Sequence, residues 1–160
     1  MAHSILNERD RAEIDRRMRS LSASSTRRWG SMDVVSMLQH LRLSARMTVG
    51  ELPVLSANKR VFQRFPLKHL ILYVLPFPKG APTATELKPS DAISFEEERA
   101  AVLELLERIG TGPHEGAGPA HPLFGPLTWS EWGVVTYKHA DHHLKPVSYT
   151  HLTLPTIYSV

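Results

Sequence analysis

Three histidines are the residues in this chain whose type and spacing are best suited to chemistry. His139 and His143 lie four residues apart in the string His-Ala-Asp-His-His, a spacing that places both on one helix face with Cβ atoms about 5–6 Å apart. His40 lies far upstream, in Ser-Met-Leu-Gln-His-Leu. If two helices bring the three rings together, the imidazoles form a site for one divalent cation. Such a site exists only once the chain has folded.

A three-histidine set suits a metal ion that keeps a position open. Catalytic zinc commonly has three protein ligands and one site for water or substrate. Neutral imidazoles leave the charge of the cation uncompensated, which lowers the pKa of a bound water or thiol toward neutrality. Zinc is the expected metal, with nickel and iron as alternatives because imidazole suits all three. The competing interpretation is that the chain has nine histidines and that these three are buried polar residues with other partners.

Three further residues are candidates for the pocket or for orienting a ligand. His142 is next to the histidine pair but rotated away from it on a helix. Asp141 could orient an imidazole, although an exposed helical aspartate is the more ordinary interpretation. His121 begins a His-Pro-Leu-Phe segment that could line a pocket, although His-Pro is also common in turns.

Several other classes of site are disfavoured. Ala140 follows His139, so the HExxH pattern of metalloproteases is missing. The chain has no Gly-x-Ser-x-Gly elbow of a serine hydrolase. It has no cysteine, which excludes disulfides, a thiolate nucleophile and cysteine-based zinc sites. The glycines between residues 110 and 119 follow a predicted helix instead of a strand, so this stretch is a linker and not a phosphate loop.

Composition indicates one globular domain. The chain has 160 residues, of which 42% are hydrophobic and 22% are charged, enough for a real core. The net charge of +3 comes mainly from residues 9–28, where acidic residues alternate with arginines, so nucleic-acid binding is disfavoured. The apolar run at 67–77 is shorter than the ~20 residues that span a membrane and predicts a buried helix. No secretory signal precedes the domain, so a cytoplasmic location is expected.

The predicted elements are helices. The first spans 7–21 with Asn7 as N-cap, and the second begins after a cap at Ser31 and ends at Gly50. Capping boxes at Ser94 and Thr128 open the third and fourth. Residues 51–94 are rich in proline and form a long crossover with at most one short helix, near 67–75. The sequence therefore predicts an all-α fold of four main helices, with the crossover between the second and third.

Two of these helices carry a family resemblance. Residues 32–41, Met-Asp-Val-Val-Ser-Met-Leu-Gln-His-Leu, and residues 139–144, His-Ala-Asp-His-His-Leu, together resemble the DinB-like superfamily of metal-binding four-helix bundles. Phe-Pro-Leu-Lys at 65–68, Pro-Lys-Gly-Ala-Pro-Thr at 78–83, His-Pro-Leu-Phe-Gly at 121–125 and Trp-Gly at 132–133 resemble a branch of it made of a domain of unknown function. The resemblance spans residues 10 to 145.

The resemblance implies a ligand set and a chemistry. In that superfamily one histidine of the second helix and two, four apart, of the last helix bind the metal, which correspond here to His40, His139 and His143. Characterised relatives include transferases that join low-molecular-weight thiols such as bacillithiol or mycothiol to electrophiles, with a divalent metal activating the thiol. The resemblance therefore implies a small-molecule substrate, while the charge pattern and the short apolar run already predict no nucleic-acid and no membrane partner.

The end of the chain departs from the family pattern. That pattern continues after His-His-Leu with a basic residue, glutamine and an aromatic residue, whereas Lys145 is followed here by Pro146. Residues 147–160 resemble translated sequencing-adaptor DNA. We therefore predict a domain at 1–145 and a non-native tail at 146–160, with the last helix fraying just past His143 because proline removes an N–H donor.

Two functions follow as hypotheses. The first is a metal-dependent transferase of a low-molecular-weight thiol to an electrophile, or a hydrolase. The second is a helical binding module without catalysis, metal-bound or metal-free, which acts as a monomer or a homodimer. The sequence leaves open whether the protein is an enzyme.

Overall fold

The structure is a computed structural model that describes residues 2–26, 32–55, 60–77, 83–90, 93–145 and 147. Within these ranges it is all-helical, as predicted. The α-helices are α1 (Glu8–Arg19), α2 (Val34–Thr48), α3 (Leu67–Tyr73), α4 (Phe95–Thr111) and α5 (Trp129–Leu144), and short 3-10 helices form η1 (Arg60–Gln63) and η2 (Thr85–Leu87). None of the described helices is long and apolar enough to cross a lipid bilayer.

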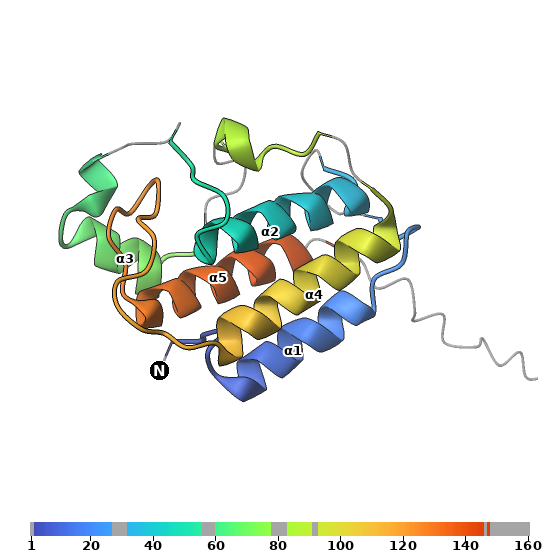
Figure 1. The fold of residues 1–160 in the computed structure, drawn as a ribbon, viewed down its shortest axis with the longest axis horizontal. Helices are drawn as coiled ribbons and strands as arrows, with labels where there is room; N and C mark the ends of the chain where they lie inside the picture. The colour runs from blue at the N-terminus through green and yellow to red at the C-terminus, as the bar shows by residue number, and fades with distance from the viewer. Residues whose placement is uncertain are drawn as a thin grey trace, which may run out of the picture.

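The four longer helices α1, α2, α4 and α5 lie side by side (Figure 1). They share one hydrophobic core, to which Ile14 and Met18 of α1, Leu38 of α2 and Val102 of α4 contribute fully buried side chains. Burying a side chain of this size contributes about 1.5–3 kcal/mol. A second, smaller core around Trp132 joins the first part of α5 to α3 and the loops. The two cores fix α5 against α2, which is the helix pair that carries the three histidines.

The helix starts follow the capping rules, with one correction. The Asn7 side chain accepts a hydrogen bond from the Asp10 N–H at the start of α1, and Thr128 and Glu131 form a complete capping box at the start of α5. The prediction that Ser31 caps the second helix is wrong. The cap is Asp33, whose carboxylate accepts from the helix amide three residues later at 2.7 Å. Aspartate caps as well as serine does, and it lies directly before the helix.

The predicted buried helix near residue 70 lies largely at the surface. Within α3 only Leu72 is buried, and Val74, just after the helix, is 65% exposed. The helix is held by Lys138 of α5, whose ammonium donates to the carbonyls of Ile71, Leu72 and Leu75 at 2.6, 3.1 and 2.6 Å. The last carbonyls of a helix lack partners within it, so α5 stabilises the end of α3 where packing is sparse.

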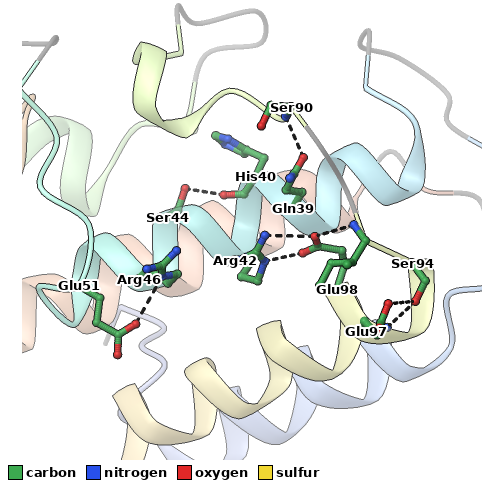
Figure 2. Close-up of polar contacts among 11 residues, drawn as sticks. Gln39, His40, Arg42, Ser44, Arg46, Glu51, Ser90, Ser94, Glu97 and Glu98 are labelled. Atoms are coloured by element: carbon green, nitrogen blue, oxygen red, sulfur yellow. Dashed lines mark hydrogen bonds and ion pairs between the residues drawn. The ribbon is translucent and has the colours of Figure 1, made fainter.

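Polar side chains on α2 connect it to Ser90, shortly before α4, and to α4 itself. The Gln39 carbonyl accepts from the Ser90 N–H at 3.0 Å. The Arg42 guanidinium donates to both carboxylate oxygens of Glu98, at 2.6 and 3.2 Å (Figure 2). Glu98 is 0% exposed, so its charge depends on Arg42 for compensation. These contacts hold Ser90 and the first turns of α4 close to the middle of α2.

Removing the arginine should leave a buried unpaired carboxylate. We expect Arg42→Met to lower the free energy of unfolding by about 3 kcal/mol, because breaking one side of a buried ion pair is much more costly than replacing both sides. The double variant Arg42→Met, Glu98→Leu should recover most of that loss. Urea unfolding followed by circular dichroism measures both. The exposed Arg19–Asp15 pair is the control, since Arg19→Met should change stability by less than about 1 kcal/mol. Equal losses in the two single variants would contradict the assigned role of Glu98.

Candidate metal centre

The structure brings together the three histidines singled out from the sequence. His40 projects from α2, and His139 and His143 project from adjacent turns of α5. The Nε2 atom of His139 lies 2.9 Å from Nε2 of His40 and 3.1 Å from Nε2 of His143. Each ring offers one nitrogen, and the three nitrogens all lie within 4.8 Å of one another. We call these three residues the histidine cluster.

The orientation of His40 is fixed by a backbone carbonyl. Its Nδ1 lies 2.8 Å from the carbonyl oxygen of Leu87 in η2. A carbonyl can only accept, so in the neutral ring Nδ1 carries the proton and Nε2 presents its lone pair to the cluster. Metal-binding histidines usually have such a partner on the second ring nitrogen. Because His40 is only 4% exposed, this tautomer is set by the protein and not by solvent.

Hydrogen bonds among the three rings cannot account for both short nitrogen–nitrogen contacts of the histidine cluster. With the His40 proton on Nδ1, the Nε2 atom of His139 must donate to His40, and it then cannot also accept from His143 at 3.1 Å. A cation in the middle would use all three lone pairs instead. With about 2.1 Å from metal to nitrogen, two ligand nitrogens are roughly 3.0–3.4 Å apart. The two observed separations are close to that range, so the residues fit a metal ion.

Burial keeps the rings in the form that binds metal. Desolvation lowers the pKa of His40, and the hydrogen bond to Leu87 partly opposes this shift. The pKa of His139 is well below its ordinary value, first because of burial and then because of the neighbouring histidines His143, His40, His142 and His121. Both His40 and His139 are therefore neutral at neutral pH, and metal binding requires neutral imidazole.

The predicted neighbours of the pair lie outside the histidine cluster. The ring of His142 is 5.2 Å from that of His143 and 6.2 Å from that of Phe77, between centroids. The carboxylate of Asp141 forms ion pairs with Arg17 at 2.8 Å and with Lys145 at 2.6 Å. In the described structure the partners of Asp141 are therefore basic side chains and not an imidazole.

His121 lies in the loop before α5 and has a defined tautomer. Its Nδ1 lies 3.1 and 3.2 Å from the backbone nitrogens of Leu123 and Phe124. Both are N–H donors, so Nδ1 accepts and the proton of the neutral ring is on Nε2. The ring packs against Trp132 of α5, with centroids 5.2 Å apart. Burial lowers the pKa of His121 to about 4, which makes it a neutral hydrogen-bond donor at pH 7.

The sequence did not reveal three further parts of the site. Leu87 supplies the carbonyl to His40, Phe77 places its ring centroid 6.3 Å from that of His139, and Thr136 has a buried hydroxyl. Leu87 and Phe77 lie between α2 and α4 in the sequence, where no periodic pattern predicts tertiary contacts. The position of Thr136 could have been predicted from the sequence, because it lies seven residues before His143 and therefore on the same face of α5.

The lowered pKa of His121 predicts a pH-dependent stability. The unfolded ring titrates near 6.5 and the folded ring near 4, so below pH 6.5 the unfolded state binds more protons and stability falls as the pH falls. Between pH 7 and 5 this should amount to about 2 kcal/mol. Urea unfolding of chelator-treated protein measures this loss of unfolding free energy between pH 7 and pH 5. The loss should be about 2 kcal/mol smaller in His121→Asn than in the wild type. The same pH dependence in both proteins would contradict a buried neutral ring.

Comparison with known proteins places the chain in a family. The family described as "Protein of unknown function (DUF1569)" matches residues 4–150. No curated protein and no solved structure is significantly similar to the chain. The matched range includes the histidine cluster, the two helices that carry it and His121. The chain therefore belongs to the DUF1569 family of proteins of unknown function.

Proposed function

We propose that this protein is a divalent-metal protein of the DinB-like four-helix-bundle type, in which His40, His139 and His143 hold the ion. The observation that carries the proposal is the convergence of three Nε2 atoms from two helices. The relation to the DinB-like superfamily rests on the resemblance of residues 32–41 and 139–144 and on the side-by-side packing of α1, α2, α4 and α5.

The surroundings of the cluster support a reactive centre. When bound, the cation would supply a Lewis acid that lowers the pKa of a thiol or water at its open position. Zinc is preferred, with nickel and iron as alternatives, because all the protein ligands are imidazoles. The chain itself orients His40 through Leu87 and keeps His139 neutral by burial. The ring of Phe77 next to His139 provides an apolar wall for a small molecule.

The preferred reaction is transfer of a low-molecular-weight thiol to an electrophile, with hydrolysis as the related alternative. The chain has no cysteine, so the thiol must be a second substrate and not part of the protein. Both reactions need the same arrangement, in which one small molecule is activated at the metal and another is placed beside it. They differ only in whether the activated group is a thiol or water.

One observation favours the second hypothesis, a helical binding module without catalysis. Apolar side chains are exposed around α3, including Phe65 at 84% and the half-exposed Leu75. Such surfaces often contact other proteins. A module of this kind would use the histidine cluster, with or without metal, only to stabilise the fold.

Metal analysis tests the ligand set. We expect one zinc, nickel or iron ion per chain after loading and desalting, measured by mass spectrometry of the metal content. His40→Ala should lose it, because two remaining imidazoles hold a cation much more weakly than three. His142→Ala is the matched control, since this histidine neighbours the histidine cluster on α5 without belonging to it, and it should keep the metal. If His40→Ala binds as much metal as the wild type, the ligand assignment is wrong.

Turnover distinguishes the two hypotheses. Metal-loaded protein should convert a chromogenic aryl electrophile with at least one low-molecular-weight thiol, and His143→Ala should lower the rate at least about 100-fold, as expected for loss of a metal ligand. His142→Ala again serves as the control. Absence of turnover with thiols and with activated esters, in protein shown to contain one metal ion, would favour the binding module.

A further inference from the structure

Thr136 has a buried hydroxyl that the protein leaves unsatisfied. The residue is 8% exposed, and its Oγ1 has no hydrogen-bond partner within the described residues. A buried helical threonine ordinarily donates to the carbonyl four residues earlier, as Thr48 of α2 does to Ser44 at 3.1 Å. An unpaired buried hydroxyl destabilises a fold. Its presence therefore points to a partner that is not part of the polypeptide.

The position of Thr136 relates this hydroxyl to the histidine cluster. His139 follows it by three residues and His143 by seven, so the three side chains share one face of α5. Trp132 precedes it by four residues on that face and packs against the ring of His121. Along α5, Thr136 thus lies between the turn that contacts His121 and the turns that carry two of the candidate metal ligands.

His121 offers a second donor that no described side chain or carbonyl uses, on a ring that is partly buried. Its Nδ1 already accepts from the N–H groups of Leu123 and Phe124, which leaves the proton on Nε2. No described residue accepts that proton. The ring is 5.2 Å from that of Trp132, between centroids, and Trp132 lies two turns before His139 on the same face of α5. Two neutral donors, Thr136 and His121, therefore lie on the same side of α5 as the candidate metal ligands.

The charges around the histidine cluster indicate what such donors would bind. Among the described residues, the group that could hold an ion consists of three imidazoles and includes no aspartate or glutamate. The nearby Asp141 is already paired with Arg17 and Lys145. A divalent cation held by neutral imidazoles would keep its full charge. The site therefore favours an anionic ligand from outside the protein.

We propose that Thr136 and His121 form a subsite beside the metal centre that binds the carboxylate of a small-molecule substrate. This inference rests on the proposed function, because the cation supplies the positive charge. A carboxylate has only acceptor oxygens, so it satisfies both donors, whereas an amine would leave them unpaired. The subsite would thereby select electrophiles that carry a carboxylate close to the reacting atom.

Acetate is a simple probe of this subsite. Cobalt(II)-loaded full-length protein should change its visible absorption on titration with acetate, and the change should saturate. Thr136→Val should weaken acetate binding about 10–100-fold, the range for loss of a hydrogen bond to a charged group. The same variant should raise Tm without acetate by about 2–4 °C, since it removes an unsatisfied hydroxyl. A purely structural threonine would show the opposite sign in Tm.

Two further variants complete the experiment. His121→Asn keeps an oxygen that can accept from the amides of Leu123 and Phe124 but removes the Nε2 proton, so it should also weaken acetate binding about tenfold or more. Thr48→Val makes the same change as Thr136→Val at a satisfied hydroxyl, and it should lower Tm and leave acetate affinity unchanged.

The outcomes separate this inference from the proposed function. Cobalt content is measured for every protein. If the wild type binds cobalt but not acetate, or if Thr136→Val binds acetate as well as the wild type does, the carboxylate subsite is refuted and the metal centre stands. If the wild type binds no cobalt, zinc, nickel or iron, the metal proposal itself fails.

Discussion

The hydrogen bond between His40 and the Leu87 carbonyl is the interaction on which the candidate site depends. It fixes the proton on Nδ1 and directs the other ring nitrogen to the two histidines of α5. The segment that carries this carbonyl is also bonded to α2, because the neighbouring Gln39 accepts from the N–H of Ser90, three residues after Leu87 (Figure 2). α2 therefore supplies both the candidate ligand and a side chain that binds the segment orienting it.

Much of the fold could be predicted because its signals are local. The caps at Asn7, Ser94 and Thr128 are each formed within four residues, so they can be recognised in the sequence. The start of α2 was misplaced because two good capping residues, Ser31 and Asp33, lie two positions apart. The apolar run around α3 was predicted to be buried, but a short apolar run shows neither how much of its surface is covered nor by what.

The part of the candidate site that lies on α5 could be predicted from residue spacing. The four-residue interval between His139 and His143 puts both rings on one helix face without knowledge of the fold. His40 could be named as a candidate from the sequence, but no local pattern links α2 to α5, so spacing could not show that the three rings meet. Leu87 acts through its backbone, so its side chain gives no hint of its role. Tertiary packing alone decides that Phe77 is close to His139 and that the Thr136 hydroxyl finds no partner.

Lys138 lies directly before a candidate ligand in the sequence, yet its N–H donors are used by the carbonyls of Ile71, Leu72 and Leu75. An ammonium group has three protons, and the three carbonyls at the end of α3 accept them. Lys138 therefore has no N–H donor left for an incoming molecule, although its positive charge remains 5.2 Å from the ring centroid of Phe77. Its hydrogen bonds instead couple α3 to the turn of α5 that bears His139, so that one side chain links the surface helix to the histidine cluster.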